Sequence, residues 1–245
     1  VVGQHINEIC AKNKTPVVLE LGGKSPMVIL KDADLSKALP LAVRSIFMYQ
    51  GQICIGSSRI YVERPLYDAF VEKYVGAVAG LGMGDMRDPD TVIGPIISNR
   101  QRKRVQSHVE DAKSKGATVA TGGAWDGNRY KPTVLTGVTE GMTVCREETF
   151  GPVTSVYPID DYEEGLQRAN DSEFGLSSAI FTNDINKAMH FAQNINAGMC
   201  HVNGMTLHDE PHVPFGGNGE SGTGREGTDA DIEEMTELKW VTIQL

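Results

Sequence analysis

The feature that most constrains the fold is a regular alternation of short apolar runs with amphipathic helical patterns along most of the chain. Five runs have the length and residue content of strands: 26–30, 59–63, 155–159, 178–182 and 199–203. Helical spacing of apolar residues fills the intervals between them, at 35–46, 65–78, 100–115, 162–169 and 185–194. Strands separated by helices pair in parallel. The sequence therefore predicts an α/β fold with three layers, in which helices cover both faces of a largely parallel sheet.

Composition and charge narrow the functional class. The chain has 245 residues, 40% hydrophobic and 22% charged, which suits a globular protein with one or two domains. A net charge of −9 without a basic cluster argues against nucleic acid as a partner. No apolar run reaches the roughly 18 residues that cross a bilayer, and no signal-peptide pattern opens the sequence, so we expect no membrane partner. Four widely spaced cysteines predict a reducing cytoplasm, no disulfides and no metal.

A cysteine lies in a glycine-flanked loop between a helical and a strand pattern. Cys54 stands between Gly51 and Gly56, which let the backbone turn sharply and a substrate approach closely. Cysteine is a strong nucleophile at neutral pH, and a loop suits a reactive thiol. The patterns around the other three cysteines indicate burial, so we expect Cys54 to be the most reactive thiol. Taken alone, Cys54 is better explained as a small buried core residue between Ile53 and Ile55.

A carboxylate precedes this loop beside a glycine turn. Residues 19–26 read Leu-Glu-Leu-Gly-Gly-Lys-Ser-Pro, which puts Glu20 thirty-four positions before Cys54. A glycine-lined, partly dry site would raise the pKa of this glutamate and make it a general base near neutral pH. Taken alone, Glu20 is as well explained as a surface carboxylate on a strand.

These two stretches together resemble the two active-site signatures of the aldehyde dehydrogenase superfamily. Two further stretches match the family: Glu-Glu-Thr-Phe-Gly-Pro at 147–152, and Pro-Phe-Gly-Gly at 214–217 followed by Ser-Gly-Thr-Gly-Arg-Glu at 221–226. The resemblance runs along the whole chain, to the C-terminal, catalytic half of such an enzyme. The stretch 201–211, with His-Val-Asn-Gly and His-Asp-Glu-Pro, resembles the benzaldehyde, vanillin and salicylaldehyde branch.

The resemblance implies a role for each matched residue. Cys54 is the nucleophile and Glu20 the general base of the implied reaction, in which an aldehyde is oxidised through a thiohemiacetal and a thioester to a carboxylate. The cofactor implied is NAD, with NADP left open, and the residues implied to contact it are Glu148, Phe150 and Gly22. Glu226 matches a carboxylate linked to proton transfer.

Substrate-binding residues follow from the resemblance and from the apolar residues near the thiol. Ile53, Ile55 and Phe215 would supply walls suited to an aromatic ring. Asn203 matches a family position that supports the site. We therefore expect an aromatic aldehyde as the small-molecule substrate.

The resemblance also divides the chain. It assigns 1–22 to the remnant of a cofactor-binding domain, 23–220 to a catalytic domain and 221–236 to a segment that returns toward the cofactor domain. The alternating segment 237–245 is expected to be an oligomerisation strand, because a strand without a hairpin mate pairs with another subunit. The implied assembly is a homodimer or higher oligomer. A cofactor-independent thiol esterase and a non-catalytic assembly fragment are the competing interpretations.

Overall fold

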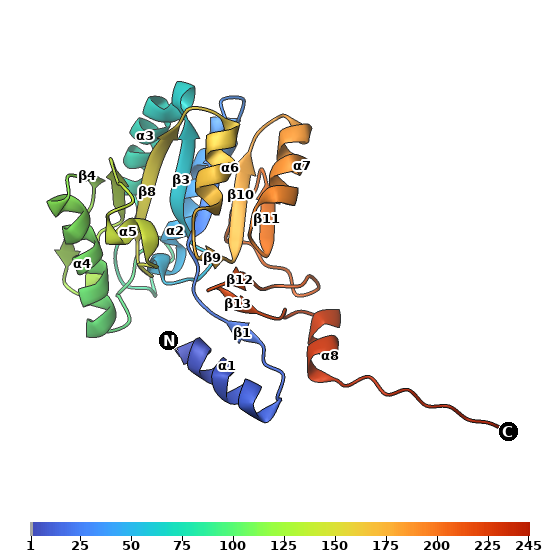
Figure 1. The fold of residues 1–245 in the computed structure, drawn as a ribbon. Coiled ribbons are helices and arrows are strands. Elements are labelled where there is room, and N and C mark those ends of the chain that lie inside the picture. The colour runs from blue at the N-terminus through green and yellow to red at the C-terminus, as the bar shows by residue number, and fades with distance from the viewer. Residues whose placement is uncertain (1) are drawn as a thin grey trace.

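A seven-stranded sheet forms the centre of the structure, a computed structural model that describes residues 2–245 (Figure 1). The strand order is β11-β10-β2-β3-β8-β7-β4, and every neighbouring pair is parallel except β4 with β7. The strands of this sheet are β2 Ser25–Ile29, β3 Ser57–Glu63, β4 Thr118–Thr121, β7 Thr133–Thr136, β8 Val153–Ile159, β10 Ser177–Phe181 and β11 Met199–Val202. The predicted parallel α/β sheet is therefore confirmed.

Helices cover both faces of this sheet. The helices around the sheet are α2 Leu35–Phe47, α3 Arg64–Ala79, α4 Asn99–Ser114, α5 Thr143–Arg146, α6 Tyr162–Asn170 and α7 Ile185–Asn194. Helices α1 Val2–Asn13 and α8 Asp229–Met235 lie apart from it (Figure 1). Met27 and Ile29 of β2 pack on one face with α2 and α3, whereas Val28 packs on the other with α4, α6 and α7. Successive side chains of a strand point to opposite faces, so a run buried on both sides reads as continuously apolar. The three predicted layers are present.

Side-chain caps fix where four of the helices begin. The side chains of Asp34, Ser98, Asp161 and Asp184 each accept a hydrogen bond from a backbone N–H in the first turn of α2, α4, α6 and α7. Such caps satisfy donors that have no partner inside the helix. Each of these helices begins within one residue of the position that the sequence pattern predicts.

Three small antiparallel pairs lie outside the main sheet. They join β1 Leu19–Glu20 to β13 Gly222–Thr223, β12 Asn218–Gly219 to β9 Phe174–Gly175, and β5 Trp125–Asp126 to β6 Arg129–Tyr130. The glycine-rich segment 216–227 thus contributes two short strands, β12 and β13. Strand β13 holds Glu20 in register with Gly222.

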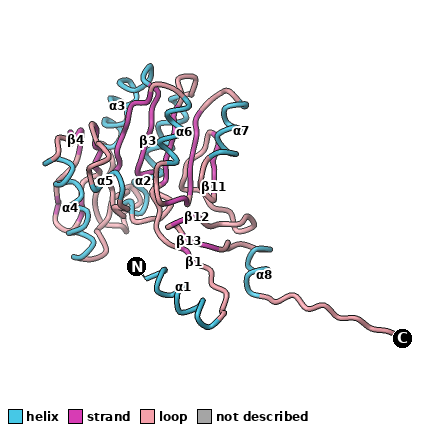
Figure 2. The backbone as a smooth tube through the Cα atoms, in the orientation of Figure 1, coloured by secondary structure: helices cyan, strands magenta, loops and turns pink. Residues whose placement is uncertain are grey.

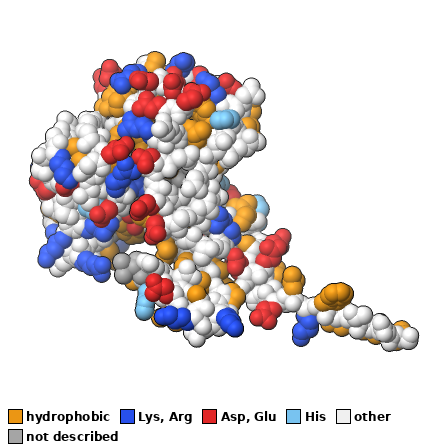
Figure 3. Space-filling view, in the orientation of Figure 1, with side chains coloured by type: hydrophobic (Ala, Val, Ile, Leu, Met, Phe, Trp, Pro, Cys, Tyr) orange, Lys and Arg blue, Asp and Glu red, His pale blue; other side chains and the backbone are white. Residues whose placement is uncertain are grey.

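The C-terminal segment differs from its prediction. Residues 237–245 form no strand in the described part of the chain and extend away from the body as an exposed tail (Figures 1 and 2). A strand requires hydrogen bonds from a neighbouring strand, and no described residue supplies them. Orange apolar atoms are visible on this tail in the space-filling view (Figure 3), where Trp240 is 93% exposed. Helix α8, which precedes the tail, was not predicted.

No helix within residues 2–245 is long and apolar enough to cross a membrane. At the other end of the chain, Val2–Asn13 form α1, and Val1 lies outside the described residues.

The order of the strands brings three distant loops together. Strands β2, β3 and β8 are neighbours in the sheet and run in the same direction. The loop that enters β2 carries Gly22 and Gly23, the loop that enters β3 carries Cys54, and the loop that enters β8 carries Phe150 and Gly151. Because these loops enter neighbouring parallel strands, they meet at the amino edge of the sheet.

Candidate active site

The Cys54 loop begins with a tight left-handed turn. Helix α2 ends at Phe47 and a short 3₁₀ turn, η1, covers Met48–Gly51. Tyr49 and Gln50 have φ values of 53° and 58°, a region that non-glycine residues occupy only when their surroundings hold them there. Gly51, at φ 65°, lies so close to Gly151 that a Cβ would overlap the Gly151 carbonyl. The loop that carries the thiol is therefore held firmly in place.

The glycine turn joins the thiol to the Glu147–Pro152 motif. The Gly23 N–H donates to Glu148 Oε1 at 2.9 Å. A Cβ on Gly23 would overlap the carbonyl oxygen of Cys54, and a Cβ on Gly22 would lie 2.7 Å from Glu148 Oε2. A side chain at position 23 would have to move the Cys54 backbone, whereas one at position 22 would displace the Glu148 carboxylate.

Replacing Gly23 by alanine should therefore displace the Cys54 loop. We expect a loss of about 1–3 kcal/mol of unfolding free energy from the overlap, together with a fall in any reaction at Cys54. Gly76→Ala is the matched control, since a Cβ there meets nothing within 4 Å. In the exposed interior of α3 it should stabilise the chain by about 0.5–1 kcal/mol. Urea unfolding measures the free energy of unfolding of both variants. A Gly23→Ala chain that is as stable as the parent would contradict this geometry.

Glu20 has the environment of a general base. Its pKa is raised to about 7, first by burial and then by the nearby charge of Glu226, while Arg225 acts in the opposite direction. Neither carboxylate oxygen has a hydrogen-bond partner among residues 2–245, although both are shielded from solvent. An unpartnered carboxylate in a dry site holds its proton more tightly than one in water. Glu20 can therefore accept a proton near neutral pH.

Glu226 lies on the same side of the site. Its backbone forms two hydrogen bonds with Phe215, from the Phe215 N–H at 2.7 Å and from its own N–H at 2.8 Å. This bridge keeps the 226 carboxylate close enough to influence Glu20, while the side chain itself stays exposed. The predicted relay residue thus lies in electrostatic range of the base.

The Cys54 thiol is half-buried, and the carboxylates of Glu148 and Glu20 are near enough to affect its pKa. Burial raises its pKa, the charges of Glu148 and Glu20 raise it further, and the N–H groups of Cys54 and Ile55 lower it. These N–H groups are donors for negative charge near the sulfur. Cys10, Cys145 and Cys200 are half-buried as well, so the prediction that burial distinguishes Cys54 from the other cysteines was wrong. Cys54 differs from them in the carboxylates and the hollow that surround it.

Glu148 and Phe150 flank the thiol from the loop before β8. Burial raises the pKa of Glu148, whereas the Gly23 N–H, Arg104 and Lys24 favour the carboxylate. Sequence reasoning missed Lys24, whose side chain is fully buried and whose pKa is lowered to about 7, chiefly by burial. A lysine next to two glycines in the sequence gives no signal of burial. Phe150 adopts a left-handed backbone with φ 52°.

A hollow of about 530 Å³ opens at Cys54. Its walls are mostly apolar, and the lining residues are Tyr49, Ile53, Cys54, Ile55, Met205, Leu207, His208, Asp209, Glu210 and Phe215. Three of these, Ile53, Ile55 and Phe215, were predicted as substrate-binding residues. Tyr49 was missed, because only the left-handed turn brings it to the hollow.

Asn203 does not line this hollow. Its side chain bonds to the backbone of Thr182, accepting from the N–H and donating to the carbonyl, both at 3.0 Å. It follows β11, so it lies at the carboxyl edge of the parallel sheet, whereas Cys54 lies at the amino edge. The prediction that Asn203 contacts substrate is not supported by this position, which makes it a support for the turn after β10.

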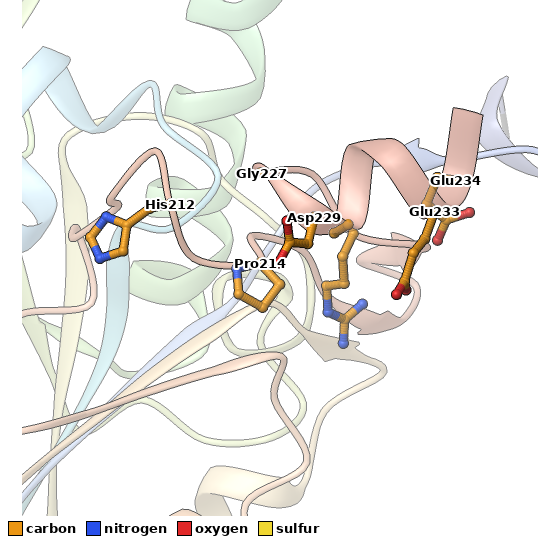
Figure 4. A pocket seen from close by; sticks show the side chains of 8 residues that line it. His212, Pro214, Gly227, Asp229, Glu233 and Glu234 are labelled. Carbon is orange, nitrogen blue, oxygen red and sulfur yellow. The ribbon is translucent and has the colours of Figure 1, made fainter. Parts of the chain in front are cut away.

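A second hollow, of about 350 Å³, lies beside helix α8 (Figure 4). His212 and Pro214 approach it from one loop, and Glu233 and Glu234 from the helix. Its lining residues include no cysteine, whereas Cys54 lines the first hollow. Within residues 2–245, no cluster of three or more His, Cys, Asp or Glu side chains is arranged to hold a metal ion.

The chain is similar to known proteins. The Aldehyde dehydrogenase family matches residues 1–241. A vanillin dehydrogenase of a Pseudomonas strain is 48% identical over 99% of this chain and 50% of its own length. A benzaldehyde dehydrogenase of Bacillus subtilis is 42% identical over 99% of this chain and 50% of its own. The chain therefore spans about half the length of these curated relatives.

Solved structures share the fold closely. A salicylaldehyde dehydrogenase from Pseudomonas putida, complexed with salicylaldehyde, superposes with a TM-score of 0.96 at 40% identity. That match covers 100% of this chain and 51% of the other. A betaine aldehyde dehydrogenase from Staphylococcus aureus, in complex with NAD⁺, gives a TM-score of 0.91 at 36% identity over 95% of this chain and 49% of its own.

Proposed function

Because the chain belongs to the aldehyde dehydrogenase family, we propose that it carries the active site of an enzyme that oxidises aromatic aldehydes to carboxylic acids, with NAD as hydride acceptor. The observation that supports this most strongly is the convergence of three motifs on the Gly22–Gly23 turn. There Glu148 accepts from the Gly23 N–H, the Cys54 carbonyl lies against Gly23, and Glu20, whose pKa is raised, lies just before the turn in the chain. Cys54 itself lines an apolar hollow.

The first step belongs to Cys54. Its thiolate adds to the aldehyde carbon, and the carbonyl oxygen of the substrate becomes an oxyanion in a thiohemiacetal. The backbone N–H of Cys54 is positioned to donate to negative charge beside the sulfur. Loss of hydride from this adduct leaves a thioester on Cys54. The apolar walls of the hollow exclude water while the adduct is present.

The second step belongs to Glu20. Its carboxylate removes a proton from a water molecule, which attacks the thioester carbon and releases the carboxylic acid and the Cys54 thiolate. A pKa of about 7 lets Glu20 take a proton at neutral pH and release it again. Glu226 is the group that would then pass this proton toward solvent, because its side chain is exposed.

The residues at the glycine turn fit the nicotinamide end of a dinucleotide. Glu148 uses one oxygen for the Gly23 N–H, which leaves Oε2 free to accept from ribose hydroxyls. Gly22 leaves open the space beside that oxygen. Glu148, Phe150 and Gly22 would hold this end of NAD or NADP. When bound, the nicotinamide ring accepts the hydride.

We also propose the division of the chain given above, with 23–220 as the catalytic domain and 1–22 and 221–236 attached to the cofactor-binding part. The tail over 237–245 would pair with a second subunit. Its apolar residues are fully available for that, since Leu238 and Trp240 are 105% and 93% exposed.

The shape of the hollow predicts a preference for aromatic aldehydes. Ile53, Ile55 and Phe215 present flat apolar surface around the thiol, and a benzene ring buries more of it than a short alkyl chain does. The solved relative with the highest TM-score quoted above holds salicylaldehyde. We expect benzaldehyde and salicylaldehyde to have specificity constants at least about tenfold above that of propanal. Steady-state kinetics decides it, and a higher constant for propanal would refute the assignment.

A thiol esterase is the second candidate, because Cys54 and Glu20 could hydrolyse an activated ester without a hydride acceptor. Incubating the chain with 4-nitrophenyl acetate, and separately with benzaldehyde plus NAD, distinguishes the two. Ester hydrolysis together with NADH formation supports the dehydrogenase. Ester hydrolysis without any NADH formation would favour the esterase, and activity in neither assay would leave only a role in assembly.

A further inference from the structure

One face of helix α4 contacts the backbone of the Glu148–Phe150 segment at successive positions. Gln101 Nε2 donates to the carbonyl oxygens of Thr149 and Phe150, each at 2.7 Å. Arg104 Nε donates to the carbonyl of Glu148 at 2.8 Å. Residues 101 and 104 lie three positions apart and therefore on the same side of the helix. Two side chains thus bind three consecutive carbonyls.

The segment that they bind is strained. Phe150 has φ 52°, a left-handed conformation that costs a non-glycine residue about 1–2 kcal/mol. Such a residue keeps its conformation only where surrounding contacts determine it. The carbonyl of Phe150 is one of the two that Gln101 binds, and the neighbouring Thr149 is buried. Gln101 therefore supplies the contact most directly placed to hold the left-handed turn.

Chemistry fixes the orientation of the Gln101 amide. Two carbonyl oxygens, which are acceptors only, face the same atom at hydrogen-bond distance, so this atom must be the NH₂ group. Gln101 itself does not line the hollow at Cys54. Its contact with the site is through the backbone carbonyls of residues 149 and 150.

We propose that Gln101 is a positioning residue that holds the Phe150 turn, and with it the Glu148 carboxylate, in the geometry that receives the nicotinamide end of the cofactor. This inference rests on the proposed function. If the turn relaxes, the Glu148 oxygens leave the Gly23 N–H and the Phe150 ring leaves its place beside Ile53. Cofactor contacts should then be lost to a greater extent than reaction at the thiol, because Glu148 and Phe150 belong to the turn itself, whereas the Cys54 loop touches it through Gly51 and Gly23.

The test compares three variants with the parent chain. Gln101→Leu removes both donors, and Gln101→Glu places a carboxylate against two carbonyl oxygens. Gln106→Leu is the matched control. It lies on the same helix and also loses two side-chain hydrogen bonds, to Glu110 and from Trp125, but these point away from the site.

Two readouts are needed: the dissociation constant of NAD, by ligand-observed NMR titration, and the turnover of 4-nitrophenyl acetate. We expect NAD affinity to fall about ten- to a hundredfold in Gln101→Leu and further in Gln101→Glu, with a smaller fall in ester turnover. Gln106→Leu should match the parent in both. Hydrogen exchange of the backbone amides of residues 149–151 should be faster than in the parent only in the Gln101 variants.

The outcomes separate the inference from the function on which it rests. Unchanged NAD affinity in Gln101→Leu, or an equal loss in Gln106→Leu, overturns the positioning role alone. Equal losses in NAD affinity and ester turnover overturn it too, because they indicate a general effect on folding. A parent chain that binds no NAD removes the cofactor part of the proposed function and this inference with it.

Discussion

Replacing Cys54 by alanine is expected to abolish both ester hydrolysis and aldehyde oxidation, with a loss of at least about a thousandfold in turnover. The thiol is the reacting atom of both reactions, and no other described residue that lines the hollow carries a comparable nucleophile. The hollow itself should persist, since alanine fills most of the space of cysteine. Cofactor affinity should therefore remain close to that of the parent.

Cys200→Ala is the matched control for this prediction. Cys200 is half-buried like Cys54, and burial likewise raises the pKa of its thiol, but it lies on β11 away from the carboxylates. The control should keep nearly full activity. An active Cys54→Ala, or an equally inactive Cys200→Ala, would show that the reaction does not take place at Cys54.

Glu20→Gln is expected to slow the release of the acyl group far more than its formation. Water needs a base to attack a thioester, whereas the thiol can be acylated without Glu20. We expect a fall of about 10²–10⁴-fold in the steady rate, with the initial burst of product retained. Rapid-mixing kinetics with 4-nitrophenyl acetate measures the two phases, and an equal loss in both would assign Glu20 another role.

The pH profile gives a second test of Glu20. Its pKa of about 7 lies above the ordinary value of 4.5, so the base is protonated and inactive at low pH. The steady rate of the parent should rise with pH through about 7, and Glu20→Gln should lack this rise.

The same shift sets the direction of the stability effect. A carboxyl group with a raised pKa in the folded state stabilises the fold below its unfolded pKa, and this contribution is lost as pH rises through about 7. Glu20→Gln should therefore gain stability relative to the parent between about pH 5 and pH 8. A variant that loses activity while becoming no less stable excludes misfolding as the cause.

Much of the fold was predictable because local patterns and tertiary packing agree. The buried runs of β2 and β10 have no polar face, and the apolar stripe of α2 matches the face that it buries. The tail at 237–245 shows the limit of such patterns. Its alternation favours a strand, but pairing depends on a partner strand that the described residues do not provide.

The site residues that belong to sequence motifs were predictable, whereas those placed only by tertiary packing were not. Cys54, Glu20 and Glu148 were identified from short stretches, and the structure brings these stretches to one glycine turn. Gly23 and Glu148 are separated by 125 positions, so only the motif match linked them in advance. No motif identified Gln101 or Lys24 in advance. Their contribution to the site depends on which groups they face in the folded chain.

The central claim is that Cys54 forms the covalent intermediate, and trapping that intermediate tests it most directly. The chain should be mixed with 4-nitrophenyl benzoate, quenched in acid during the burst, digested and mapped by mass spectrometry. We expect a benzoyl group on the peptide that contains Cys54, and we expect it to persist longer in Glu20→Gln. A benzoyl group on Cys10, Cys145 or Cys200 instead, or none at any cysteine during turnover, would contradict it.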